Sequence, residues 1–401
     1  MTVFVQGSSS EPTDLIRSLV AAPEASDGVH YVSCQIPGLN RCDLAGLHPN
    51  TCATGLFVTP EAAASYQARK FRFMPLSYSG MYDYLASLKV DIALIQVGKH
   101  GGSDAFTLGS SIHFVPAVLK QAEVVIAELN ECLPKPGRSL DLEAGRLDYI
   151  VPVDHELPSL NTDLPSSLAR KIGAHIAGLV SNGDSLQVGI GKIPSAILDR
   201  LHGHKQLACH GGLVSESMID LHDVGALDPT RPIICTSVIG SKRVYDWVDG
   251  REHVHVLPVT ETHSVLRIAE IERFVAVNSV LSVDLAGQAN AETINGRQVG
   301  GSGGLSDFMR GARMSRKGRS ILALPSTAGG GKISRIVNEL TSDIASCPRV
   351  DADYVVTEHG IAALRNKSLD ERALALISIA EPAFRQDLER AWERRRSEGA
   401  A

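Results

Sequence analysis

Leu186-Gln-Val-Gly-Ile-Gly-Lys-Ile-Pro-Ser-Ala-Ile-Leu198 is the stretch that decides the fold. Residues 186–190 form a short apolar run, which predicts a buried strand. Gly189 and Gly191 permit a tight turn and a close approach to a ligand, and Pro194 suits the first turn of a following helix. A strand end, a glycine turn and a helix N-terminus together present N–H groups to an anion or a polarised oxygen. The spacing alone leaves a ligand site and a purely structural role for these glycines equally open.

The next predicted strand, residues 206–209, ends at His210-Gly211-Gly212. Two glycine-bearing strand ends joined by one helix predict a crevice at the carboxyl edge of a parallel sheet, where ligands bind. His210 then has two interpretations: it polarises a bound carbonyl, or it is a hydrogen-bonded core histidine. Other apolar runs without polar alternation, separated by helical stretches, indicate a parallel sheet covered on both faces; they lie at 91–97, 124–129, 320–325 and 354–357. A further strand is predicted at 55–59 and a helix at 13–21.

The composition indicates a globular α/β protein of two domains. A length of 401 residues exceeds one ordinary domain, and 44% hydrophobic residues exclude a disordered chain. Aromatic residues make up only 5% while glycines number 36, which favours tight strand-to-helix turns over stacking platforms for nucleic acid. A net charge of −6 without a basic block also argues against a nucleic-acid partner. Prolines and acids gather between Leu133 and Leu164, so we place the domains at 1–160 and 161–401.

The amino terminus lacks the basic and apolar regions of a secretion signal, and no run approaches the roughly 20 apolar residues of a membrane helix. We therefore expect a cytoplasmic protein without a membrane partner. Seven cysteines, an odd number with no C-x-x-C pair, favour reduced thiols over disulfides. None of the 14 histidines falls in a metal-ligand spacing, so no metal site is predicted.

Two further glycine-rich loops are candidate ligand contacts. Gly300-Gly-Ser-Gly-Gly304 precedes a predicted helix. Ordering so flexible a loop is entropically costly, which favours close approach of Gly301, Gly303 and Gly304 to a ligand over a mobile linker. Gly329-Gly-Gly-Lys-Ile-Ser-Arg335 adds Lys332, which suits a phosphate or a carboxylate, although the spacing of a Walker A loop is absent.

Glu358 and His359 directly follow the apolar run at 354–357. A carboxylate at a strand end in a glycine-lined crevice is a candidate nucleophile or base. The alternative is that Glu358 caps a helix predicted over 361–364.

These motifs resemble one family. It is the acetyl-CoA hydrolase/transferase family. The segments that resemble its motifs are Gly-Ile-Gly-Lys-Ile-Pro-Ser-Ala-Ile (189–197), residues 278–292 and 303–312, Ala-Leu-Pro-Ser-Thr-Ala (323–328) and residues 354–365. The family includes 4-hydroxybutyrate and butyrate:acetate CoA-transferases, and the likeness extends from Phe4 over nearly the whole chain. The resemblance implies two tandem CoA-transferase-type (NagB/RpiA-like) α/β domains with largely parallel sheets, an active site between them and a homodimer. It also implies coenzyme A, an acyl-CoA and a small carboxylate as substrates, with no tightly bound cofactor.

The resemblance also implies a mechanism, from which this sequence departs. In the family a glutamate carboxylate attacks the acyl-CoA thioester, which gives an enzyme-acyl anhydride and then an enzyme-CoA thioester. That glutamate aligns with Gly212 here. A second family loop is altered to Lys99-His100-Gly101-Gly102, and a further family glutamate is Ser282. The glycines 189, 191, 301, 303 and 304 would remain as N–H donors to the thioester oxygen, a kind of contact worth about 3–4 kcal/mol to a transition state.

Other acids are candidates for the missing role, as nucleophile or as base for water. We rank Glu358 first, because it matches a family acid near the substrate. Glu216 follows, one helical turn past Gly212 if that segment is helical, and then Glu261 in Thr-Glu-Thr-His. Cys209 lies in an apolar strand, where a thiol is inert.

The sequence thus predicts an enzyme that moves CoA between an acyl-CoA and a carboxylate. Three alternatives stay open: a thioester hydrolase with a carboxylate-activated water, a CoA-ester lyase or decarboxylase, and a non-catalytic CoA-binding protein. Because Gly212 takes less space than a glutamate, we expect a bulkier or branched acyl group.

Overall fold

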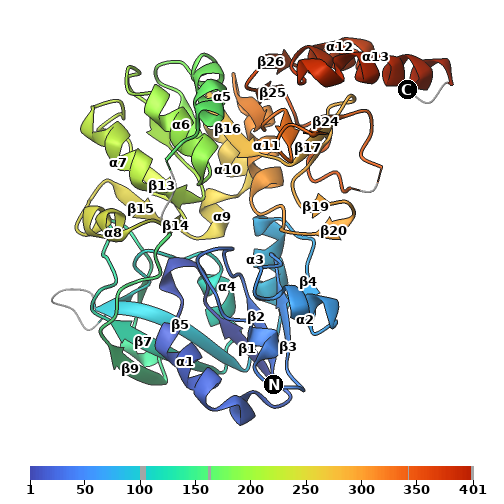
Figure 1. Ribbon diagram of the computed structural model, residues 1–401. Coiled ribbons are helices and arrows are strands. Elements are labelled where there is room, and N and C mark those ends of the chain that lie inside the picture. Colours follow the sequence, from blue (N-terminus) through green and yellow to red (C-terminus); the bar gives the residue numbers. More distant parts are fainter. Residues whose placement is uncertain (100–104, 161–163, 342, 399–401) are drawn as a thin grey trace.

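The computed structural model describes residues 1–99, 105–160, 164–341 and 343–398, which form two lobes (Figure 1). Each lobe is built on a largely parallel sheet, so the predicted α/β class is confirmed. The strands of the first sheet precede residue 160 and those of the second follow it; the division into domains 1–160 and 161–401 stays a prediction. His100, Gly101 and Gly102 of the altered loop lie outside the described residues.

In the first lobe, parallel strands run in the order β4-β3-β2-β1-β5-β7-β9. Short antiparallel strands, β6 and β8, continue from the end of β5. The strands are β1 (Thr2–Val5), β2 (His30–Ser33), β3 (Cys52–Gly55), β4 (Phe71–Phe73), β5 (Ile92–Lys99), β6 (Phe106–Thr107), β7 (Val124–Asn130), β8 (Asp141–Leu142) and β9 (Tyr149–Val153). The helices are α1 (Thr13–Ala21), α2 (Ala63–Gln67), α3 (Tyr78–Ser87) and α4 (Val115–Leu119).

In the second lobe, the main sheet has the order β11-β10-β16-β21-β25-β26, with only β26 antiparallel. Its strands are β10 (Ser185–Val188), β11 (Ala208–Cys209), β16 (Phe274–Ser279), β21 (Arg319–Ala323), β25 (Tyr354–Thr357) and β26 (Gly360–Ala363). The helices are α5 (Ser167–Ala177), α6 (Lys192–Arg200), α7 (Glu216–Asp223), α8 (Lys242–Val248), α9 (Val259–Thr262), α10 (Val265–Glu270), α11 (Leu305–Met314), α12 (Leu369–Ser378) and α13 (Pro382–Ser397). None of the helices in the described ranges is both long and apolar enough to cross a membrane.

Several short ladders in this lobe are separate from the main sheet. Parallel pairs join β12 (Leu213–Val214) to β14 (Ser237–Val238), β13 (Ile233–Cys235) to β15 (Val254–Val256), and β17 (Ser282–Asp284) to β24 (Ile336–Val337). Antiparallel pairs join β17 to β18 (Ala289–Asn290), β19 (Thr293–Ile294) to β20 (Arg297–Gln298), and β22 (Thr327–Ala328) to β23 (Ile333–Ser334).

The two lobes are joined by buried hydrogen bonds between their loops. Ile112 N–H donates to the Thr236 carbonyl at 3.0 Å, and Val238 N–H donates to the Ser110 carbonyl at 2.8 Å. The buried Asp307 carboxylate of α11 accepts from the Ser79 hydroxyl of α3 at 2.6 Å. Because these contacts fix α3 and the loop before α4 against the second lobe, residues of both lobes can shape one cavity.

Two predicted elements are wrong. The helix expected over 361–364 is the strand β26, since Gly360, at φ 143°, turns the chain back so that β26 pairs antiparallel with β25. The apolar run at 55–59 was expected to be a strand, but β3 ends at Gly55. Leu56 and Phe57 instead pack where the lobes meet, beside Gly301 and Gly303.

Candidate active site

A cavity of about 290 Å³ lies between the lobes, beyond the carboxyl ends of β10 and β16. The first lobe contributes Ile36, Pro37, Phe57, Tyr78 and His113 to its wall. The second lobe contributes Gln187, Val188, Gly189, Ile190, Gly212, Leu213, His263, Asn278, Ser302, Gly303, Gly304, Leu305 and Phe308. The wall is mostly apolar, and among these residues none has a formally charged side chain at neutral pH.

The structure brings four of the predicted glycines together in this wall: Gly189, Gly212, Gly303 and Gly304. Gly191, at φ 116°, lies on the far side of the same turn and opens α6. It lines a neighbouring cavity of about 440 Å³, together with Lys192 and Arg335.

Two predicted binding residues do not line either cavity. Gly301 packs on the first lobe, where an added Cβ would lie 2.0 Å from the Leu56 carbonyl oxygen. Lys332 is exposed and follows Gly329–331, whose positive φ angles form the hairpin between β22 and β23.

Gly212 opens directly onto the cavity. A Cβ built there would lie 3.4 Å from His263 Nε2 and 4.0 Å from Phe308 Cε2, which are ordinary contact distances. The residue is not among the glycines with a positive φ, so its backbone accepts any L side chain. A side chain at position 212 would therefore point at the imidazole of His263.

His263 is a polar residue of the cavity wall that is not among the predicted site residues. It is 2% exposed, and its ring stacks on Tyr78 with centroids 4.7 Å apart. Its Nδ1 lies 2.8 Å from the Thr262 hydroxyl. Burial, and then the nearby His113 and His210, hold its pKa well below the usual value, so the imidazole is neutral. The segment Thr-Glu-Thr-His contains this residue, but sequence reasoning selected Glu261 from it.

His210 is a buried histidine next to the cavity but not in its wall. Its Nε2–H donates to the Thr262 carbonyl at 3.0 Å, and burial lowers its pKa to about 4. Of the two interpretations of His210, a residue that polarises a bound carbonyl and a hydrogen-bonded core histidine, this geometry agrees with the second.

The three predicted acids lie outside the wall of the cavity. Glu216 opens α7, and its carboxylate accepts from the Ser241 N–H at 2.6 Å. The prediction that Gly212 and Glu216 lie one helical turn apart is wrong, because Gly212 precedes the strand β12. Glu261 is on α9 with 46% of its side chain exposed, 3.7 Å from Arg267.

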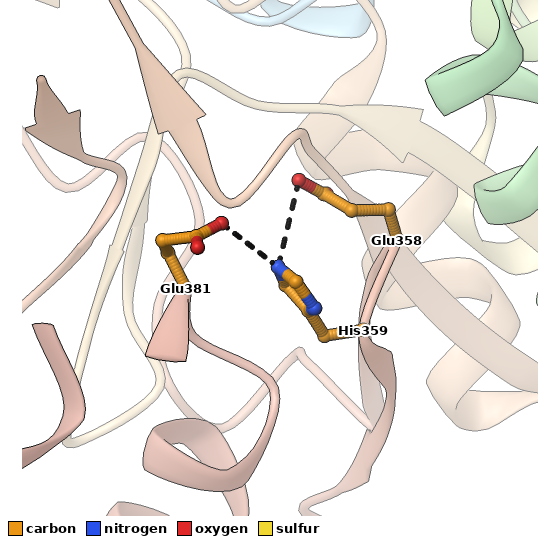
Figure 2. Close-up of side chains that lie close together, drawn as sticks. All are labelled: Glu358, His359 and Glu381. Carbon is orange, nitrogen blue, oxygen red and sulfur yellow. Dashed lines mark hydrogen bonds and ion pairs between the residues drawn. The ribbon is translucent and has the colours of Figure 1, made fainter. Parts of the chain in front are cut away.

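Glu358 is held at the end of β25 by a network of its own. Its carboxylate accepts from the Ser326 N–H at 2.9 Å and from the Ser326 hydroxyl at 2.7 Å. Figure 2 shows His359 between two carboxylates, with Nε2 3.1 Å from Glu381 and 3.9 Å from Glu358. Glu358 also interacts electrostatically with Arg335 in the neighbouring cavity. The roles of the three acids in catalysis stay predictions.

Acid is expected to destabilise the folded protein through its buried histidines. Burial lowers the pKa of His113 to about 3 and of His210 to about 4, and that of His263 well below its usual value. Below pH 6.5 the unfolded chain therefore binds more protons at these sites, and each lowers the free energy of unfolding by up to about 1.4 kcal/mol per pH unit.

Glu11 opposes this effect, because burial raises its pKa to about 7 and the folded state holds a proton that the unfolded state has lost. Because three histidines outweigh one glutamate, these four groups give a net slope near pH 5, with a free energy of unfolding that decreases as the pH falls. Urea unfolding at pH 7.5, 5.5 and 4.5 measures it. His113→Asn, which tolerates the residue's φ of 42°, should reduce the slope by about 1.4 kcal/mol per pH unit; an unchanged slope would contradict the assignment.

Comparisons with known proteins agree on one family. The model of the acetyl-CoA hydrolase/transferase N-terminal domain matches residues 62–159, and that of the C-terminal domain matches residues 240–392. The chain is 33% identical over 394 residues to a 4-hydroxybutyrate coenzyme A transferase of Clostridium kluyveri, covering 96% of this chain and 92% of the relative. It is 27% identical over 339 residues to an acetyl-CoA hydrolase of Neurospora crassa, covering 72% and 62%. The crystal structure of a 4-hydroxybutyrate CoA-transferase from Porphyromonas gingivalis superposes with a TM-score of 0.82 at 28% identity, covering 98% of this chain and 94% of that one.

Proposed function

Because the chain belongs to the acetyl-CoA hydrolase/transferase family, we propose that the cavity at Gly212 binds an acyl-CoA thioester and that the acyl group passes directly from CoA to an acceptor. The predicted enzyme class, CoA-transferase or acyl-CoA hydrolase, is that of the relatives. We further propose that no glutamyl intermediate forms at position 212, where the resemblance places the family's glutamate and this chain has glycine.

The observation that carries the proposal is the composition of the cavity wall. Four glycines meet there, at positions 189, 212, 303 and 304, and the lining residues within the described ranges include no aspartate or glutamate. The backbone can approach a thioester closely at the glycines, and none of the described residues in the wall offers a carboxylate to receive the acyl group. This composition supports the proposal that the acceptor itself attacks the carbonyl.

Two acceptors are consistent with this arrangement. A substrate carboxylate would attack the thioester to give a mixed anhydride and CoA thiolate, and the thiolate would then attack the other carbonyl of the anhydride. This is CoA transfer in a ternary complex. Water is the second candidate, favoured by the imidazole of His263 beside Gly212, and it would give the free acid and CoA.

The neighbouring cavity is proposed to hold the CoA moiety. It shares Ile190 with the first cavity, and Lys192 and Arg335 give it cationic side chains that suit phosphates. We propose Glu358 as a positioning residue, since it interacts with Arg335 and fixes Ser326 beside β21. Lys332, at the exposed hairpin, stays proposed as a phosphate contact. A homodimer and a cytoplasmic location also stay proposals, which light scattering and cell fractionation would test.

The test is to incubate the protein with acyl-CoAs, with and without acetate, while following free thiol and the masses of CoA esters. Acetyl-CoA that forms only with acetate indicates transfer, and free CoA in both samples indicates hydrolysis. Loss of CO₂ from the acyl group would instead indicate a lyase. If CoA stabilises the fold thermally but no acyl-CoA is turned over, the protein is a binding protein and the proposal is wrong.

The acyl group is expected to be larger than acetyl. Each additional buried carbon contributes about 0.8 kcal/mol in an apolar pocket, and isobutyryl has about two more carbons than acetyl. Its kcat/KM is therefore expected to be roughly tenfold that of acetyl-CoA. Steady-state kinetics with the two esters measure the ratio, and turnover of acetyl-CoA alone would contradict the expectation.

A further inference from the structure

We infer that His263 is the general base of this site and that the acceptor is a neutral O–H or N–H nucleophile, which enters the space left open at Gly212. This inference rests on the proposed function and deepens it, because it chooses between a carboxylate and a protic acceptor.

The first support is the position of the imidazole edge. His263 Nε2 lies 3.4 Å from the Cβ position of Gly212 and 2.7 Å from that of Gly304. The ring is held between Tyr78, at a centroid distance of 4.7 Å, and Phe308, at 4.5 Å. A base must be fixed within hydrogen-bond reach of the proton that it takes. His263 meets this condition for a nucleophile of one or two heavy atoms at Gly212.

The second support is the hydrogen bond on the other ring nitrogen. The Thr262 hydroxyl donates to the Pro258 carbonyl at 3.3 Å, so it accepts from His263 Nδ1–H at 2.8 Å. The proton of the neutral imidazole is then on Nδ1, and the lone pair of Nε2 faces the cavity. The arrangement parallels other catalytic histidines, in which a partner on one nitrogen orients the other.

The third support is the charge of the surroundings. Among the residues that the structure describes in the cavity wall, none is Asp, Glu, Lys or Arg. The titratable groups that act on His263 from other elements are His113 before α4 and His210 after β11, and burial lowers the pKa of both, so they are neutral. A carboxylate acceptor would lose its hydration there without a cation to replace it. A protic acceptor carries no charge into the cavity and donates a hydrogen bond to Nε2.

The reaction that follows balances without any further reagent. The acceptor oxygen or nitrogen attacks the thioester carbon while its proton moves to His263 Nε2. The tetrahedral oxyanion lies beside the glycine N–H groups, then collapses with cleavage of the C–S bond. The CoA sulfur leaves with the pair of electrons and takes the proton back from Nε2. The products are the acyl-acceptor compound and free CoA thiol.

The experiment compares acceptors and variants of the full chain with isobutyryl-CoA. Wild-type protein is assayed in water alone and with ethanol, methoxyamine (an amine that is neutral at pH 7) or acetate, with products identified by mass. We expect acid, ester or amide together with free CoA, and no acetyl-CoA. His263→Ala should lose about 10²- to 10⁴-fold in rate, and added imidazole should restore part of it. His263→Asn, which keeps a partner for Thr262, should be equally slow while CoA still stabilises its fold as in wild type.

The possible failures are distinguishable. Acetyl-CoA formed from acetate faster than thiol release would overturn the inference and leave the proposed function intact. A full rate in a folded His263→Asn protein would do the same. An absence of both free CoA and acetyl-CoA with every acceptor would overturn both together.

Discussion

Gly212→Glu is expected to give this enzyme a covalent CoA intermediate that the wild-type chain does not form. The new Cβ fits, since its nearest neighbours are His263 Nε2 at 3.4 Å and Phe308 Cε2 at 4.0 Å. The backbone needs no positive φ, so the carboxylate can extend into the cavity without strain. An enzyme carboxylate beside a bound thioester can attack it, and the resemblance assigns a family nucleophile to this position.

The measurement is the intact mass of each protein after incubation with acyl-CoA, with and without borohydride or hydroxylamine. The variant should gain the mass of CoA and lose it on treatment, and its acyl exchange should follow ping-pong kinetics. Gly212→Gln is the matched control, because it has the same shape without a nucleophile. An adduct on the wild-type protein would contradict the account, as would a variant that binds CoA but forms no adduct.

Gly304→Ala is expected to lower kcat/KM about 100-fold while CoA binding persists. Its Cβ would lie 2.6 Å from His263 Cδ2 and 2.9 Å from Phe308 Cε2, which is closer than such atoms approach. His263 is buried, stacks on Tyr78 and is hydrogen-bonded to Thr262. The added methyl group therefore fits only if the imidazole ring shifts away from its position at the cavity. A displacement near 1 Å at a reacting group costs about 10²-fold in rate.

Steady-state kinetics measure the loss of kcat/KM in Gly304→Ala, and the thermal shift on adding CoA shows whether the variant still binds CoA. Gly300→Ala is the control in the same loop, since the nearest atom to its Cβ, the Ala291 carbonyl oxygen, is 3.9 Å away. It should keep the wild-type rate. Equal rates for Gly304→Ala and wild type would mean that His263 and Gly304 do not contact the reacting atoms.

Local patterns predicted most of the site's backbone. The apolar run and glycine turn at 186–191 became β10 and the start of α6, with Gly191 in a conformation that only glycine adopts readily. The helix Thr13–Ala21 and the strand Tyr354–Thr357 have the predicted bounds. These elements depend on residues close in sequence, which is why a single chain suffices to find them.

The composition of the cavity could not be predicted in the same way. His263 faces Gly212 across 51 positions of sequence, and its ring is fixed by Tyr78 from the other lobe. Val259 N–H donates to the His113 carbonyl at 3.2 Å, so the placement of α9 depends on contact between the lobes. Glu358 ranks first among the acids because it matches a family acid near the substrate, yet Ser326 takes both of its carboxylate oxygens. Such long-range contacts leave no periodic signal in the sequence.

A crystal structure with a non-hydrolysable isobutyryl-CoA analogue tests the central claim most directly. We predict the acyl carbonyl in the cavity between Gly212, Gly304 and His263, with the CoA moiety passing the Gly189–Gly191 turn toward Lys192 and Arg335. An acyl group bound outside this cavity, with Tyr78 and Phe308 closing the space at Gly212, would contradict it.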